Sequence, residues 1–189
     1  MDAPSGQRLV YLMGASGSGK DTLLRQLRTA LQPDEAVLVA HRYITRPSSD
    51  HEASIALSEM EFQRRVELGC FALYWRSHGL HYGIGVEIDA WLAGNAVVII
   101  NGSRAHLAQT YARYPDLTAI EVTVDPDVLA ARLTQRGRET PSQIQARLQQ
   151  ATQRYMVPAA CAITSLSNNT HPDDATRRLL AITRDLLSR

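Results

Sequence analysis

The sequence predicts an α/β protein in which a parallel sheet is flanked by helices in three layers. Two continuous apolar runs, Leu9–Met13 and Ala96–Ile100, are typical of central strands buried on both faces. Predicted strands alternate with predicted helices along the chain, which is the pattern of a parallel sheet with crossover helices. A glycine-rich loop joins the first of these strands to the first helix.

Length and composition indicate one globular domain. The 189 residues can bury a sizeable core, and 44% hydrophobic with 21% charged residues is ordinary for a globular protein. The net charge of +1 does not favour a nucleic-acid partner. Two cysteines without metal-ligand spacing favour a reducing compartment, and we find neither a secretory signal nor a membrane-span pattern. We expect a cytoplasmic protein without a membrane partner, and its oligomeric state stays open, with a homodimer among the options.

The first half of the chain begins with a strand and a helix that carries leucines on one face. Ser58 with Glu61 three residues later predicts a capped helix start. Gly79, Gly83 and Gly85 predict an irregular segment. The predicted elements are strand Leu9–Met13, helix Lys20–Leu31, strand Ala36–Ala40, loop Thr45–Ala53, a helix from Ser58 to about Leu68, and strand Phe71–Trp75.

The second half repeats the alternation of strands and helices. Asp125-Pro126 and Thr140-Pro141 each pair an N-cap residue with a proline at the first helical position. The predicted elements are strand Ala96–Ile100, helix Ser103–Arg113, strand Thr118–Val124, a helix from Pro126 to about Gln135, a helix from Pro141, strand Cys161–Leu166 and helix Pro172–Leu187.

The loop from Gly14 to Lys20 reads Gly-Ala-Ser-Gly-Ser-Gly-Lys, which fits seven of the eight positions of the P-loop pattern G-x-x-x-x-G-K-[ST]. Its glycines let backbone N–H groups point at phosphate oxygens, and the following helix N-terminus adds positive potential. The alternative, a Gly/Ser-rich turn with a chance lysine, lacks the strand and helix found here. The loop predicts a P-loop NTPase fold, with the candidate ATP-binding residues Gly14, Ala15, Ser16, Gly17, Ser18, Gly19, Lys20, Asp21, Thr22 and Arg132.

The eighth position of the pattern holds Asp21 in place of Ser or Thr. A carboxylate is a good Mg²⁺ ligand, directly or through water. The alternative is that Asp21 only complements the dipole of the helix. We hypothesise that Asp21 serves the metal of a Mg²⁺–ATP complex.

Arginines cluster in the segment after the fifth predicted strand, Thr118–Val124. Arg132, Arg136 and Arg138 are followed by Arg147, and Gly137 can end the helix. Guanidinium groups neutralise the charge that spreads over a phosphoryl group during transfer. We predict a lid over roughly residues 132–147, with Lys20, Arg136, Arg138 and Arg147 as catalytic residues. The alternative is a solvated basic helix end.

A second basic pair, Arg42 and Arg46, follows the second predicted strand. That position lies at the carboxyl edge of the sheet, where ligands bind in open α/β folds. The pair predicts an anionic acceptor substrate, with ordinary surface arginines as the alternative.

The chain resembles the guanylate-kinase-like branch of the nucleoside monophosphate kinases over most of its length. The matching pieces are the P-loop, Ile44-Thr45-Arg46, Leu57–Phe62, His81-Tyr82-Gly83 and the arginine-rich lid segment. Several residues of guanine-binding relatives are replaced: Ser49 stands for a second arginine, Ile84 for a hydroxyl residue, and Asn101 follows the strand that otherwise ends in an aspartate.

These departures resemble a narrower family, the ribose 1,5-bisphosphate phosphokinases. The shared motifs are Gly-Lys-Asp, Ala40–Arg46, Ile55–Ser58, Tyr82–Asp89 and Asn101–Ala105. The resemblance implies phosphoryl transfer from ATP to α-D-ribose 1,5-bisphosphate, giving 5-phosphoribosyl 1-diphosphate and ADP in phosphonate use. It implies a guanylate-kinase-like domain over residues 1–189, with a core of roughly 7–40 and 95–189 and an acceptor-binding segment of roughly 41–94. The expected acceptor-binding residues are Arg42, Arg46, Tyr82, Glu87, Asp89, Asn101, Ser103 and Arg104.

Four alternatives remain. A guanylate kinase or a gluconate kinase would share the fold. A catalytically inactive guanylate-kinase-like binding module is disfavoured by the intact Lys20 loop and the arginine-rich segment. A signalling GTPase is disfavoured because the chain has no Asn-Lys-x-Asp motif. A nucleic-acid-binding module is disfavoured by the near-neutral charge.

Overall fold

A five-stranded parallel sheet forms the centre of the molecule. The computed structural model describes residues 6–47, 53–137 and 140–189. The strand order is β2-β7-β1-β8-β9, and every neighbouring pair is parallel. The strands are β1 (Leu9–Gly14), β2 (Val37–Val39), β7 (Val97–Asn101), β8 (Thr118–Thr123) and β9 (Ile163–Ser167). The parallel sheet predicted from the apolar runs is therefore confirmed.

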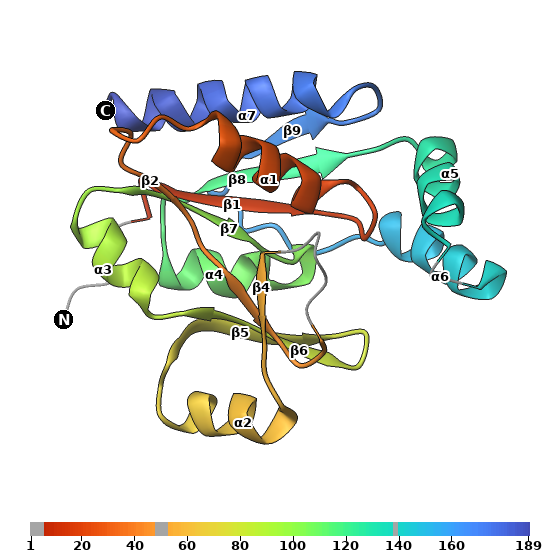
Figure 1. Ribbon diagram of the computed structural model, residues 1–189, viewed down its shortest axis with the longest axis horizontal. Helices are drawn as coiled ribbons and strands as arrows, with labels where there is room; N and C mark the ends of the chain where they lie inside the picture. The colour runs from red at the N-terminus through yellow and green to blue at the C-terminus, as the bar shows by residue number, and fades with distance from the viewer. Residues whose placement is uncertain (1–5, 48–52, 138–139) are drawn as a thin grey trace.

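Helices cover both faces of this sheet, as Figure 1 shows. On one face lie α1 (Lys20–Ala30) and α7 (Pro172–Leu187). On the other face lie α3 (Glu87–Ala93), a short 3-10 turn (Arg104–His106) and α4 (Leu107–Arg113). The predicted helix Ser103–Arg113 is thus divided between a 3-10 turn and an α-helix.

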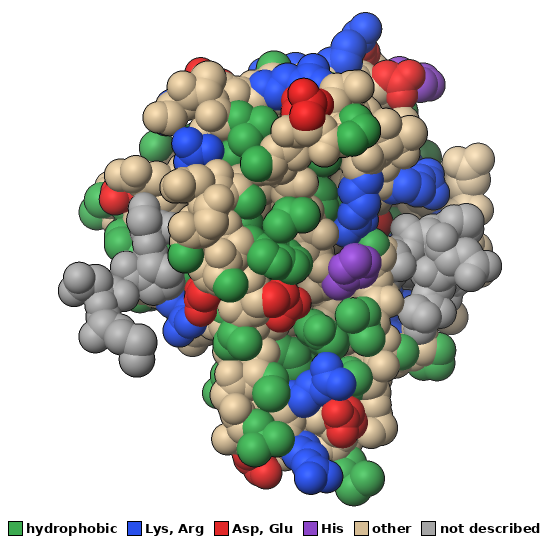
Figure 2. Space-filling view, turned by 60° about the vertical axis from the view of Figure 1, so that its left-hand side comes forward, with side chains coloured by type: hydrophobic (Ala, Val, Ile, Leu, Met, Phe, Trp, Pro, Cys, Tyr) green, Lys and Arg blue, Asp and Glu red, His purple; other side chains and the backbone are tan. Residues whose placement is uncertain are grey.

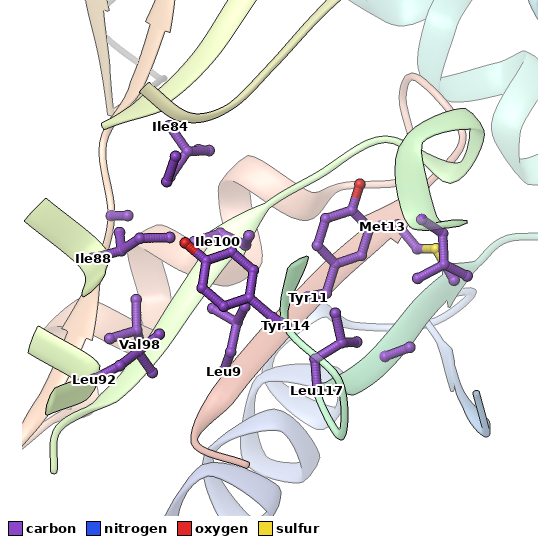
Figure 3. Packing of buried hydrophobic residues seen from close by; sticks show 14 of the residues in the cluster. Leu9, Tyr11, Met13, Ile84, Ile88, Leu92, Val98, Ile100, Tyr114 and Leu117 are labelled. Atoms are coloured by element: carbon purple, nitrogen blue, oxygen red, sulfur yellow. The ribbon is translucent and has the colours of Figure 1, made fainter. Parts of the chain in front are cut away.

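The central strand β1 sends alternate side chains into two hydrophobic cores. Leu9, Tyr11 and Met13 face the core that includes α3 and α4, and Figure 3 shows them beside Tyr114 and Ile100. Val10 and Leu12 face the core that α1 and α7 cover. All five side chains are fully buried. Burial on both faces explains why this strand appears in the sequence as a continuous apolar run.

A second, four-stranded sheet extends below the first in Figure 1, with α2 (Glu59–Glu67) beside it. Its order is β4-β3-β6-β5, with β5 and β6 joined as an antiparallel hairpin. The strands are β3 (Arg42–Ile44), β4 (Ser54–Ala56), β5 (Phe71–Ser77) and β6 (Leu80–Gly85).

The prediction of an irregular segment around Gly79, Gly83 and Gly85 is wrong, because β6 runs through it as a regular strand. Only Gly79 has a positive φ, 76°, at the hairpin turn. Gly83 is needed for packing: a Cβ there would lie 2.6 Å from the Phe71 ring on the neighbouring strand. That contact joins residues of different strands, so the local sequence pattern does not reveal it.

Two helices project to one side of the central sheet in Figure 1. These are α5 (Pro126–Arg136) and α6 (Pro141–Ala151), and both begin at the predicted proline. Thr140 and Gln143 form a reciprocal capping box at the start of α6. Gly137, at φ 65°, ends α5 in the left-handed conformation. No helix in the described ranges is long and apolar enough to cross a membrane.

Candidate active site

A cleft of about 1370 Å³ opens at the carboxyl ends of the central strands. The P-loop forms one wall, the β5–β6 hairpin and β3 form another, and α5 and α6 form the third. A single drug-sized ligand needs roughly 300–1,000 Å³, so this cleft is large enough for a nucleotide and a second substrate together.

The charge in this cleft is strongly positive. Within the described ranges, its lining includes eight arginines and Lys20 but one carboxylate, Asp21. The arginines are Arg25, Arg42, Arg46, Arg104, Arg132, Arg136, Arg147 and Arg154. On the face shown in Figure 2, acidic and basic side chains are mixed, and the whole chain carries only +1. The cleft is therefore suited to polyanionic ligands such as phosphates.

The P-loop owes its shape to two glycines and to a distant asparagine. Gly17 and Gly19 have φ values of 92° and 93°, which disfavour any side chain. A Cβ on Gly19 would also lie 2.5 Å from the Asn168 amide nitrogen. Asn168 is 2% exposed and donates from Nδ2 to the Ser18 carbonyl at 2.8 Å. Sequence reasoning missed this residue, although its place directly after the last strand puts it at the ligand edge of the sheet.

Lys20 is poised inside the loop. Its Nζ donates to the carbonyl oxygens of Gly14 and Ala15, both at 2.9 Å. Burial lowers the pKa of Lys20 from 10.5 to about 8; the Asp21 charge opposes this shift, and the charge of Arg42 adds to it. Phosphate oxygens arriving beside Nζ would stabilise the charged form, which is the role expected of this lysine.

Asp21 lies in the first turn of α1, where the P-loop wall of the cleft meets the wall that contains β3. Its Oδ1 accepts a hydrogen bond from Asn101 Nδ2 at 2.8 Å and lies 3.7 Å from an Arg42 nitrogen. The Asp21 side chain is 40% exposed, whereas Asn101 is 4% exposed and does not line the cleft. The structure thus brings Asn101 to Asp21 and not to the cleft itself.

The acceptor wall is an aromatic stack that carries an arginine. The Arg42 guanidinium lies over the Tyr82 ring, 5.2 Å from its centroid. The ring of Tyr82 in turn stacks on Trp75 at 5.6 Å and 9°. Arg46 lines the same wall, as does His78, whose φ of 51° is uncommon for a residue other than glycine. The stack fixes Arg42 facing the P-loop.

The segment from Asn101 to Arg104 packs against the buried side chain of Tyr11. The Tyr11 hydroxyl donates to the Ser103 carbonyl at 2.7 Å and accepts from the Ser103 N–H at 2.9 Å. Gly102 is required here because a Cβ would lie 2.2 Å from the Tyr11 ring. Ser103 and Arg104, two of the expected acceptor-binding residues, both line the cleft.

Arg104 also contacts the end of α6, within the predicted lid segment. Its guanidinium donates to the carbonyls of Gln150 and Ala151, at 2.8 and 2.7 Å, where α6 ends. It lies 3.7 Å from Glu121 and over the ring of Tyr155. A cation at a helix C-terminus is favourable, so Arg104 connects α6 to the sheet edge.

Three of the predicted lid arginines lie in the same cleft as the P-loop. Arg132, Arg136 and Arg147 line the cleft, and Arg147 donates to the Ser16 hydroxyl. The fourth predicted lid residue, Arg138, lies outside the described residues.

Two predicted acceptor-binding residues lie elsewhere. Glu87 and Asp89 are in the first turn of α3, and neither lines the cleft. Asp89 accepts from Arg113 at 2.8 Å and from the Tyr114 hydroxyl at 2.5 Å. This ion pair joins α3 to α4, so the structure gives Asp89 a structural contact and does not bring it to the site.

Comparison with solved structures identifies the fold. A guanylate kinase from Anaplasma phagocytophilum has a TM-score of 0.66 at 15% identity, over 100% of this chain and 90% of that chain. A gluconokinase from Sinorhizobium meliloti 1021 has a TM-score of 0.53 at 18% identity, over 100% and 96%. Together with the P-loop motif, these likenesses define the class as a P-loop protein of guanylate-kinase-like fold.

Curated relatives narrow the class to a family. A protein of Achromobacter xylosoxidans (strain A8), ribose 1,5-bisphosphate phosphokinase PhnN, is 62% identical over 97% of this chain and 95% of its own length. A protein of the same name from Burkholderia mallei (strain SAVP1) is 48% identical over 96% and 98%. No family model matches the chain. At this identity and coverage, the chain belongs to the ribose 1,5-bisphosphate phosphokinase family.

Proposed function

We propose that this protein transfers the terminal phosphoryl group of ATP to ribose 1,5-bisphosphate, giving ADP and 5-phosphoribosyl 1-diphosphate. The observation that carries the proposal is the charge of the cleft, in which eight arginines and Lys20 face one carboxylate within the described residues. A triphosphate and a bisphosphate together bring enough negative charge to balance such a site. The relatives' name supplies the acceptor.

The transfer needs positioning and charge neutralisation more than acid–base chemistry. An oxygen of the acceptor's 1-phosphate attacks the γ-phosphorus, the bond from that phosphorus to the bridging oxygen of ADP breaks, and ADP leaves. The attacking oxygen is already ionised at neutral pH, so no general base is required. Lys20 would neutralise the β- and γ-phosphates, and Arg136 and Arg147 the moving group. Arg42 and Arg46 would hold the acceptor's phosphates beneath the lid.

Mg²⁺ is the cofactor that we propose, and it would screen the phosphate charge when bound. Asp21 fits this ion, because its exposed carboxylate directly follows Lys20 and lines the cleft beside the P-loop, the end of the cleft where the phosphates of ATP would bind. Within the described ranges, no group of three or more His, Cys, Asp or Glu residues gathers to hold a metal. Phosphates and waters would then supply the remaining ligands, as is usual for Mg²⁺ in kinases. Thr22 lines the same end of the cleft.

Guanylate kinase activity is the second candidate, favoured by the fold of the solved neighbour. Ile84 speaks against it. Guanine-binding relatives are expected to have a hydroxyl residue at this position, whereas Ile84 is fully buried in the core beside Ile88. The acceptor ribose 1,5-bisphosphate has no base, so it needs no hydroxyl residue at this position to recognise one.

The test is a coupled assay for 5-phosphoribosyl 1-diphosphate with purified protein, ATP, Mg²⁺ and ribose 1,5-bisphosphate, run beside GMP and gluconate as rival acceptors. Of the three acceptors, only ribose 1,5-bisphosphate is expected to give product. Lys20→Met should abolish product formation, and its cooperative thermal unfolding transition should remain. Phosphorylation of GMP without formation of 5-phosphoribosyl 1-diphosphate would overturn the proposal.

We further propose a cytoplasmic location. The donor ATP is an intracellular nucleotide, and Cys70 and Cys161 are free thiols, as expected in a reducing compartment.

A further inference from the structure

Three side chains from different elements meet where the two substrates would face each other. Asp21 lies in the first turn of α1, Asn101 ends β7 and Arg42 begins β3. Asn101 Nδ2 donates to Asp21 Oδ1 at 2.8 Å, and an Arg42 nitrogen lies 3.7 Å from the same oxygen. Asp21 is thus engaged more closely by a neutral amide than by the nearby cation.

Asn101 is an unexpected residue for its surroundings. It is 4% exposed and follows four fully buried aliphatic residues of β7. Its Oδ1 is buried and has no hydrogen-bond partner among the described residues. Leaving a buried amide oxygen unpaired is costly, and a leucine, which has the same branched shape, would avoid that cost. The Nδ2 donor to Asp21 is the contact that accounts for a carboxamide at this position.

The carboxylate of Asp21 has competing attractions. Its charge acts on the pKa of both Lys20 and Arg28, and Arg42 is its ion-pair partner at 3.7 Å. Lys20 Nζ is occupied by two P-loop carbonyls. Without the Asn101 bond, the carboxylate would close on Arg42. It would then neutralise a cation that the acceptor needs and turn away from the phosphate end of the cleft.

We propose that Asn101 is a positioning residue, whose carboxamide holds the Asp21 carboxylate toward the metal–phosphate end of the cleft and keeps the Asp21–Arg42 ion pair, now 3.7 Å long, from closing into a hydrogen-bonded contact. The inference rests on the proposed use of Mg²⁺–ATP. It gives Asn101 a role through Asp21 in place of direct contact with the acceptor.

A double-mutant cycle tests this role with Mn²⁺ as the probe. Asn101→Leu keeps the branched shape of the side chain and removes the donor, and Asp21→Asn removes the charge. The affinity of the enzyme–ATP complex for Mn²⁺ is measured by electron paramagnetic resonance, and metal-free ATP binding by calorimetry. Asn101→Leu should weaken Mn²⁺ binding roughly 10- to 100-fold, as loss of an outer-shell partner does, with little change in metal-free ATP affinity.

The decisive result is the coupling between the two substitutions. In the Asp21→Asn background, Asn101→Leu should cost no further Mn²⁺ affinity, because its target is gone. Losses that multiply in the double variant would overturn the proposal, as would unchanged Mn²⁺ affinity in Asn101→Leu. A rise in the acceptor KM of equal size in both backgrounds would also overturn it, since it would show direct contact.

Two further variants serve as controls for effects on folding. Asn101→Ala repeats the test if the leucine does not fit. Thr183→Val is the matched control: Thr183 is fully buried and bonds the Leu179 carbonyl within α7, away from the cleft lining. It should change thermal stability and leave Mn²⁺ affinity unchanged. The Mn²⁺ measurements use no acceptor, so they stand even if ribose 1,5-bisphosphate proves to be the wrong substrate. If 5-phosphoribosyl 1-diphosphate forms without the coupling, only this inference falls.

Discussion

ATP affinity should fall as the pH rises above 8, because Lys20 loses its charge in the free enzyme. Burial lowers the pKa of Lys20 to about 8. Bound phosphates raise it again, since they favour the charged form. ATP binding therefore takes up a proton above pH 8, and by linkage its affinity is full below the free-state pKa and lost above it. Each pH unit above 8 should therefore lower the affinity for ATP about tenfold.

The size of the effect follows from that pKa. At pH 9.5 the dissociation constant for ATP should be roughly 30-fold higher than at pH 7.5, which is about 2 kcal/mol of binding free energy. Calorimetry at pH 9 in two buffers of different ionisation enthalpy should show uptake of about 0.9 proton per ATP bound. The phosphates of ATP are fully ionised throughout this range, so they contribute no slope.

Lys20→Arg provides the control for this experiment. Arginine stays charged at every pH used, so the variant should bind ATP with an affinity that is flat between pH 7.5 and 9.5, whatever its absolute value. A dissociation constant for the unsubstituted protein that does not change between pH 7.5 and 9.5, or the absence of proton uptake at pH 9, would refute the assigned role of Lys20.

Three further changes test the loop and the lid. Asn168→Ala removes the donor to the Ser18 carbonyl and should cost about 1–3 kcal/mol of stability by thermal unfolding, together with weaker ATP binding by calorimetry; unchanged values for both would contradict the support that we assign to Asn168. Arg104→Met releases the carbonyl end of α6 and should speed amide hydrogen exchange in that helix selectively, whereas uniform exchange across the chain would indicate only global destabilisation. Arg147→Ala should lower kcat on the order of 10²–10³-fold with a smaller change in the KM for ATP; a loss confined to KM would place Arg147 in ground-state binding.

The central sheet and its helices were predictable because their signals are local. A continuous apolar run marks β1, and prolines after capping residues mark the starts of α5 and α6. Helix α7 spans Pro172–Leu187, as predicted. The second sheet was harder, because Gly83 serves a contact with Phe71 of the next strand and not a turn.

The residues of the candidate site also divide into those that local sequence could predict and those that it could not. Lys20 and its glycines are contiguous, so one segment of sequence contains both the motif and its strand–helix context. Glu87 and Asp89 share a motif with the family but lie outside the cleft, because α3 turns Asp89 toward Arg113. A sequence motif shows which residues occur together and does not show which way a helix faces.

The sequence by itself determined the P-loop, the order of most strands and helices, and the family resemblance, because each depends on residues close together in the chain. Only the tertiary structure decided that Asn168 supports Ser18 and that Asn101 engages Asp21, pairs separated by 150 and 80 residues. It also decided that Arg104 reaches the end of α6. The physical reason is that these contacts form where parallel strands bring their carboxyl ends to one edge, and strand order in space is not written in local sequence patterns.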